Sequence, residues 1–150
     1  MANFVFNIAK GRAVELYNRV DINDPSTATI TVVVLESAGL ETQANLEDSL
    51  TIAEVLDGAT NEQVTMGRKS LADTDIVAFT NDTTNNRNDL DLPDQTWTGA
   101  TGNAVGALVI CYNPTAGADT TIIPLSHHDF AVTPDGSDIT AQIAVFFRAS

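Results

Sequence analysis

The stretches TATITVVVL, at residues 27–35, and AVGALVICY, at residues 104–112, decide the fold of this 150-residue chain. Both are rich in β-branched and large apolar residues, which is the composition of strands that are buried on at least one face. A third stretch, residues 139–147, carries an apolar side chain at every second position, the spacing of a strand with one buried face. Together they predict a protein built mainly from β-strands.

Further strand-like segments lie around these three, and turn-rich segments separate them. We expect additional strands at residues 4–8, 14–20, 63–71, 76–79 and 120–125, a strand start near residues 92–97, and an exposed loop at residues 80–91. One short helix is expected at about residues 51–57, because Thr51 and Glu54 have the spacing of a capping box. Eight or nine strands without regular strand–helix alternation predict a single domain, residues 1–150, with an antiparallel β-sandwich or jelly-roll-like fold.

The charge of the chain excludes several classes of partner. Lys and Arg number 7 and Asp and Glu number 20, which gives a formal net charge of −13. Nucleic acids and anionic membranes are bound by clustered Lys and Arg, so we expect neither as a partner. One cysteine excludes an internal disulfide, and no apolar run approaches the roughly 20 residues that span a bilayer. The start of the chain lacks the apolar core of a signal peptide, so we expect a soluble protein made inside the cell.

The first 20 residues differ from the rest in charge. They contain three basic residues and one acidic residue, whereas residues 21–150 contain four basic and nineteen acidic residues. This basic and aromatic start has two interpretations. It forms a first strand packed in the chain's own core, or residues 1–12 form an extended N-terminal arm that pairs with the sheet edge of a neighbouring chain.

No group of residues predicts a chemical reaction. His127 and His128 are neighbours, and neighbouring side chains on a strand point to opposite faces, so they are poorly placed to bind one metal ion. We expect a strand end or loop with partly exposed imidazoles there. Cys111 lies inside an apolar stretch, which is typical of a buried structural thiol.

Four aspartates, Asp82, Asp89, Asp91 and Asp94, raise a calcium hypothesis, because carboxylate oxygens are suitable ligands. Their spacing does not match the twelve-residue calcium loop, so a solvated acidic loop is the preferred interpretation. We therefore assign no catalytic, cofactor-binding or metal-binding residues and expect no enzyme.

Several segments resemble a known family. The opening MANFVFNIAKGRAVELYNRV, residues 1–20, resembles the start of small virion-associated proteins of tailed bacteriophages. Residues 68–71 (RKSL), 91–97 (DLPDQTW) and 106–112 (GALVICY) follow one another in an order that resembles β-sandwich head-decoration proteins. In those proteins an arginine-bearing strand precedes a tryptophan-bearing segment and a central strand that begins with glycine. The closing segment, residues 130–147, is similar in character.

The resemblance implies a decoration, or cement, protein that binds the outer surface of a phage head and stabilises contacts between capsomers. Its implied partners are the major capsid protein and other copies of itself, as a homotrimer. Its implied location is the virion, after synthesis in the cytoplasm of the host bacterium. The acidic surface agrees with an outside position, since packaged DNA repels it. The residues expected to make the protein–protein contacts are Phe4, Phe6, Lys10, Arg12 and Arg19.

Two other functions stay open. The chain could be another structural part of the virion, in the tail, the neck or the fibre base, because the same sandwich serves there. It could also be a carbohydrate- or calcium-binding β-sandwich module, which would use Asp89, Asp91 or Asp94 to bind the metal.

Overall fold

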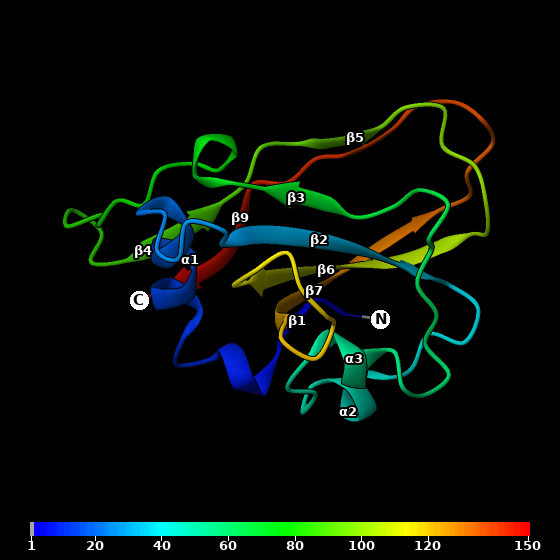
Figure 1. The fold of residues 1–150 in the computed structure, drawn as a ribbon, viewed down its shortest axis with the longest axis horizontal. Coiled ribbons are helices and arrows are strands. Elements are labelled where there is room, and N and C mark those ends of the chain that lie inside the picture. Colours follow the sequence, from blue (N-terminus) through cyan, green and yellow to red (C-terminus); the bar gives the residue numbers. More distant parts are fainter. Residues whose placement is uncertain (1) are drawn as a thin grey trace.

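A five-stranded antiparallel sheet forms the centre of the protein in the computed structural model, which describes residues 2–150 (Figure 1). The strands are ordered β1-β7-β6-β2-β3 across the sheet. Their bounds are β1 (Phe4–Val5), β2 (Thr29–Glu36), β3 (Lys69–Leu71), β6 (Val105–Asn113) and β7 (Ile123–Val132). The predicted mainly β, antiparallel architecture is confirmed.

Strands β2 and β6 occupy the middle of the sheet and correspond to the two stretches that predicted the fold. They pair over their whole length, with Val33 opposite Val109. Val32, Val33, Val34 and Leu35 are fully buried, as is Val109. Burial on both faces explains why these strands are continuously apolar instead of alternating.

The second layer is a two-stranded antiparallel ribbon that is interrupted near its middle. Strand β4 (Asn88–Asp91) pairs with β9 (Val145–Ala149), and β5 (Gln95–Trp97) pairs with β8 (Ile139–Ala141). Both sides of the ribbon break at the same level, and there the Asp94 carboxylate accepts a hydrogen bond from the Ile143 amide at 2.9 Å. The ribbon contributes Leu90, Trp97 and Phe146 to the same hydrophobic cluster as the sheet. The arrangement is therefore sandwich-like.

The unbroken alternation expected over residues 139–147 is wrong beyond Ala141. Ile139 and Ala141 are buried as expected, but Val145 is 41% exposed and Phe146 is buried instead. The pairing of β9 with β4 shifts register at this point, since Leu90 lies opposite Phe147 and Asp91 opposite Val145, which leaves Phe146 as an extra residue in β9. An extra residue of this kind bends the strand and turns its side chain to the other face. The sequence spacing cannot show this shift, because it depends on the pairing with β4.

Three other strand and loop predictions need correction. Residues 88–91, expected in an exposed loop, form β4 and bury Leu90 completely. Residues 76–79, expected to be a strand, lie in no strand, although Ile76 is buried. The strand expected at residues 63–71 is limited to its last three residues, in β3.

The strand expected at residues 14–20 is wrong, because this segment forms the longest helix of the described chain, α1 (Ala13–Asp21). Its buried residues are Ala13, Leu16, Tyr17 and Val20, which have helical spacing. The Tyr17 hydroxyl donates to the carbonyl of Asp91, at 2.7 Å, or to that of Val77. These contacts attach α1 to the ribbon.

The remaining helices are single turns. They are η1 (Asn7–Ala9), α2 (Gln43–Leu46), α3 (Ile52–Val55) and η2 (Asp73–Asp75). The helix expected at residues 51–57 is therefore confirmed in position but is shorter. Half of its predicted capping box is present, since the Thr51 hydroxyl accepts from the Glu54 amide at 3.3 Å. The reciprocal bond is not formed, because the Glu54 carboxylate accepts from the amide of Leu50 instead of that of Thr51.

The N-terminal segment lies against its own domain. Strand β1 pairs with β7, the Phe6 amide donates to the Leu125 carbonyl, and η1 follows. Phe6 is fully buried and Phe4 is 9% exposed. An extended arm over residues 1–12 is therefore not the conformation seen at residues 2–12, and Met1 lies outside the described residues. Within residues 2–150, no helix is long and apolar enough to cross a membrane.

Candidate binding surface

The two neighbouring histidines lie inside β7 and have different environments. His127 is fully buried, and its ring stacks on Phe4 with 4.6 Å between the ring centroids. Neither ring nitrogen of His127 has a hydrogen-bond partner within the described chain. The expectation of partly exposed imidazoles is wrong for His127, because β1 and the core cover it. Burial lowers the pKa of His127 to about 4, so this ring is neutral at pH 7.

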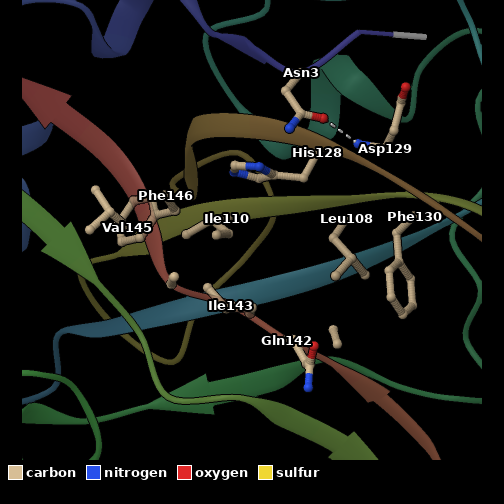
Figure 2. Close-up of a pocket in the computed structure, with 12 residues that line it drawn as sticks. Asn3, Leu108, Ile110, His128, Asp129, Phe130, Gln142, Ile143, Val145 and Phe146 are labelled. Carbon is tan, nitrogen blue, oxygen red and sulfur yellow. Dashed lines mark hydrogen bonds between the residues drawn. The ribbon is translucent and has the colours of Figure 1, made fainter.

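His128 faces a different surface from His127. It lines a hollow of about 240 Å³ between β6, β7 and residues 141–146, together with Leu108, Ile110 and Phe130 (Figure 2). Its Nε2 atom lies 2.8 Å from the Ser126 hydroxyl. Burial lowers the pKa of His128 as well. The histidines therefore do not converge on one point, and the walls of the hollow combine apolar side chains with polar groups from Asn3, His128 and Gln142.

Three of the four aspartates of the calcium hypothesis, Asp82, Asp89 and Asp94, are engaged by other groups of the protein through their carboxylates, whereas Asp91 accepts a bond through its backbone carbonyl. Asp89 binds Arg148 at 2.6 Å and Arg87 at 3.1 Å, and Asp82 lies 3.4 Å from Arg87. Asp94 accepts the bond that bridges the break in the ribbon. Among residues 2–150, no group of three or more His, Cys, Asp or Glu side chains is placed to hold a metal ion.

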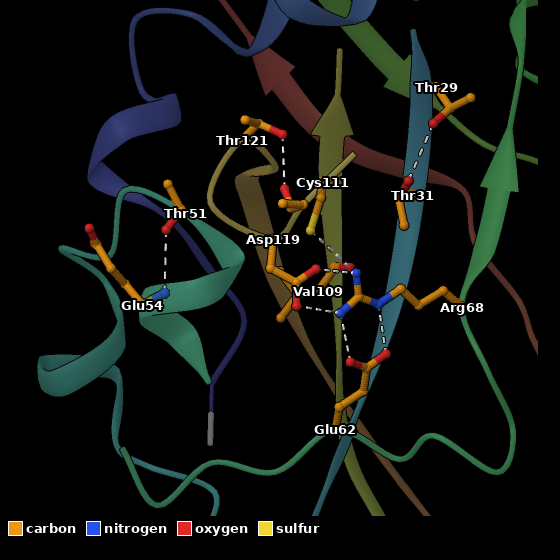
Figure 3. A network of polar contacts seen from close by, with 11 residues as sticks. Thr29, Thr31, Thr51, Glu54, Glu62, Arg68, Val109, Cys111, Asp119 and Thr121 are labelled. Atoms are coloured by element: carbon orange, nitrogen blue, oxygen red, sulfur yellow. Dashed lines mark hydrogen bonds and ion pairs between the residues drawn. The ribbon is translucent and has the colours of Figure 1, made fainter. Parts of the chain in front are cut away.

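A network around Arg68 is the main polar cluster that the sequence did not indicate. The Arg68 guanidinium donates to both carboxylate oxygens of Glu62 and to both of Asp119 (Figure 3). The hydrogen bonds to these two carboxylates raise the pKa of Arg68, and Arg68 in turn holds the pKa of Asp119 below its usual value. Because Asp119 is 51 residues away in sequence, spacing alone gives no sign of this contact.

Cys111 lies close to this network and is fully buried, as expected. Burial raises the pKa of its thiol well above the ordinary value. A thiol in that state is a poor nucleophile, which agrees with a structural role.

The expected contact residues divide into two groups. Phe4 and Phe6 pack in the core and are covered, so these side chains do not form an outer surface. Lys10, Arg12 and Arg19 are all exposed, around η1 and the exposed side of α1. The structure therefore exposes the three basic side chains and covers the two aromatic ones, and the contact role of the basic residues stays a prediction.

A groove runs beside this basic surface, between α1 and the adjoining ends of β6 and β7. We call it the basic groove; its volume is about 430 Å³, and it is lined by Arg12, Glu15, Leu16, Arg19, Tyr112, Pro114 and Ile123. The Arg12 guanidinium has no hydrogen bond or ion pair with any other described residue, although the Arg12 backbone bonds to Ala9 and Leu16. Arg19 pairs with Glu15 at 3.2 Å, and both side chains are largely exposed. An exposed pair of this kind contributes little stability and exchanges readily for another partner.

Tyr112 lies in the floor of the basic groove and is 4% exposed. Its position in the groove depends on α1, which the sequence analysis predicted as a strand. The groove was therefore missed because the element that forms one of its walls was wrongly assigned.

Comparison of this chain with known protein families, with curated proteins and with solved structures finds no match in any of the three.

Proposed function

We propose that this protein is a structural component of a tailed-phage particle, a decoration protein that binds the outer surface of the head and stabilises contacts between capsomers. It acts by docking and catalyses no reaction. Its partners are the major capsid protein and other copies of itself, and it is assembled onto the virion after synthesis in the host cytoplasm.

The observation that carries this proposal is the separation of charge on the surface. Lys10, Arg12 and Arg19 are exposed together, on a chain whose net charge is −13. Three of the other four basic side chains, Arg68, Arg87 and Arg148, are held in ion pairs with acidic residues. The fourth, Lys69, lies over the Trp97 ring. The basic surface beside the groove is thus the part of this molecule that suits an acidic protein surface.

The rest of the surface supports an outside location on the head. A strongly acidic protein is repelled by packaged DNA and gains nothing from contact with it. The sequence resemblance to head-decoration proteins and the sandwich-like fold favour the same role. Binding energy would come from apolar area and from complementary charge at the contact.

The test is a binding experiment with heads assembled from the major capsid protein of the same phage and lacking this protein. We expect the purified chain to co-sediment with the heads and to appear in many copies on their outer faces in electron micrographs. Because Phe4 and Phe6 are buried, deletion of residues 2–12 would disturb the core, so the variant to compare is Lys10→Glu/Arg12→Glu, which changes exposed side chains only.

Three results would contradict the proposal. Absence of the chain from the head pellet excludes a decoration role, and density confined to the neck, tail or fibre base assigns it to another part of the virion. Calcium uptake in calorimetry, lost in Asp89→Asn, would favour the binding-module alternative.

A further inference from the structure

The basic groove contains three hydrogen-bond donors with unused capacity. The Arg12 guanidinium has no partner in the described chain, and the Arg19 guanidinium has only an exposed Glu15. The third donor is the Tyr112 hydroxyl, which makes no hydrogen bond with any other residue of the described chain. The ring of Tyr112 is covered, but its hydroxyl oxygen is not among the buried unpartnered atoms, so it is open to the groove. All three donors can therefore bind a ligand that enters the groove.

The chemistry of these donors defines what they bind. Two guanidinium groups and a phenol hydroxyl suit carboxylate oxygens, which accept several hydrogen bonds at once. The floor beside them is apolar, formed by Leu16, Pro114 and Ile123. A matching partner therefore presents carboxylates next to an exposed apolar side chain.

The same chain carries such a surface on the segment with α2 and α3. Residues 36–62 contain seven acidic residues and no Lys or Arg. Within this segment Asp48, Glu54 and Asp57 are exposed, and Leu50 lies among them with 52% of its surface accessible. We call these four residues the acidic knob. A large apolar side chain exposed among charges is a common mark of a contact surface.

We propose that the basic groove of one copy receives the acidic knob of a second copy of this chain. Carboxylates of the knob accept hydrogen bonds from Arg12, Arg19 and the Tyr112 hydroxyl, and Leu50 packs on the apolar floor. This inference deepens the proposed function, on which its biological meaning rests, by naming the surface through which copies associate.

Charge also selects this arrangement over other contacts between copies. Two chains of net charge −13 repel each other over most of their surfaces. The basic groove of one copy attracts the acidic residues of the other, so the electrostatic interaction of the two molecules favours one relative orientation. Each copy has both halves of the contact, so no other protein is needed to form it.

The experiment is sedimentation of the purified full chain without heads, over a range of protein concentration and in low salt. We expect an assembly larger than the monomer. Arg12→Glu/Arg19→Glu, and separately Glu54→Lys/Asp57→Lys, should each weaken association by at least about tenfold, since each pair reverses charges at the contact. An equimolar mixture of the two double variants should associate again, because the reversed groove then meets the reversed knob.

Two further variants separate the contact from general effects of charge. Thr83→Glu/Thr84→Glu adds two negative charges in an exposed loop that is part of neither surface and should leave association nearly unchanged. Tyr112→Phe keeps the net charge and should weaken association by removing one donor. Circular dichroism of each variant checks that the fold is intact.

A monomeric wild-type chain at high concentration would overturn the inference, as would charge-reversed variants that associate as well as the wild type. Binding to heads is measured separately, so the two proposals fail separately. A chain that self-associates but does not bind heads retains the groove contact and loses the decoration role.

Discussion

Arg68 and Arg12 show two uses of arginine in one acidic protein. Arg68 is partly buried and is held by two carboxylates from segments far apart in sequence, so its charge is compensated inside the molecule. Arg12 is exposed, and its guanidinium has no partner in the described chain. The first charge is part of the fold, and the second is available to another molecule. Since the residue type is the same, the difference teaches that exposure to solvent distinguishes an arginine that stabilises the fold from one that can bind another molecule.

Removal of Arg68 should produce the largest loss of stability. Arg68→Ala leaves Glu62 and Asp119 close together without a cation, and because this network is only partly buried we expect a loss of about 2 kcal/mol of unfolding free energy, as for hydrogen bonds to charged groups. Urea unfolding at pH 7 measures the loss. Arg12→Ala is the matched control and should change the unfolding free energy by less than about 0.5 kcal/mol, as is usual for exposed sites. Equal effects of the two substitutions would remove the distinction between them.

Lowering the pH should distinguish His127, which has no hydrogen-bond partner in the described chain, from the Arg68 network, because the two lose their contributions to stability at different pH values. The pKa of His127 in the folded protein, about 4, is below its ordinary value of 6.5, so the unfolded chain binds the proton more readily. The stability that comes from neutral His127 is therefore complete above pH 6.5 and is lost as the pH falls toward 4. The nearby Asp129 raises this pKa and His128 lowers it, but burial is the larger cause.

The Arg68 network should not contribute to that loss of stability. The pKa of Asp119 is lowered from 3.8, so its contribution is present above that pH and disappears only below it. Between pH 7 and pH 4.5, the free energy of unfolding should therefore depend less on pH in His127→Phe than in the wild type, which urea unfolding at each pH measures. An identical slope in both proteins would show that another group titrates.

The exposed pair of Arg148 and Asp89 should show the smallest effect of a broken ion pair. Arg148 is half exposed, and Arg87 remains beside Asp89 after Arg148 is removed. Arg148→Ala should cost less than about 1 kcal/mol, as is typical of surface pairs. The loss should shrink further in high salt, which screens exposed charges more than buried ones. A cost similar to that of Arg68→Ala would show that exposure is a poor guide to the role of an arginine.

The sequence was informative wherever burial left a continuous apolar pattern. Strands β2 and β6 were predicted nearly to their ends, because both faces of each strand are covered and no polar alternation interrupts them. Segments with one buried face were harder to predict. At residues 14–20 an alternating pattern and a helical pattern coexist, and only packing of Leu16 and Tyr17 against the core favours the helix.

The candidate site was predictable in part for the same reason. Basic residues clustered near the start of the chain are visible in the sequence, and the structure exposes Lys10, Arg12 and Arg19, whose contact role stays a prediction. The groove beside them was not visible in the sequence, because its other wall comes from Tyr112, Pro114 and Ile123, about 100 residues later. Contacts between distant segments depend on the folded topology and leave no local pattern.

The break in the ribbon is the point at which the second layer best tolerates insertions and deletions, whereas its paired strands tolerate them poorly. At the break, Asp94 secures the Ile143 amide without requiring either side chain to face inward. Changes in length at residues 142–144 therefore meet the least resistance from strand pairing, whereas one residue lost within β8 or β9 would expose the buried face of that strand. The break thus separates the pairing register of β4 with β9 from that of β5 with β8. Each register can change without the other as sequences diverge, whereas the strands of the central sheet share one continuous register.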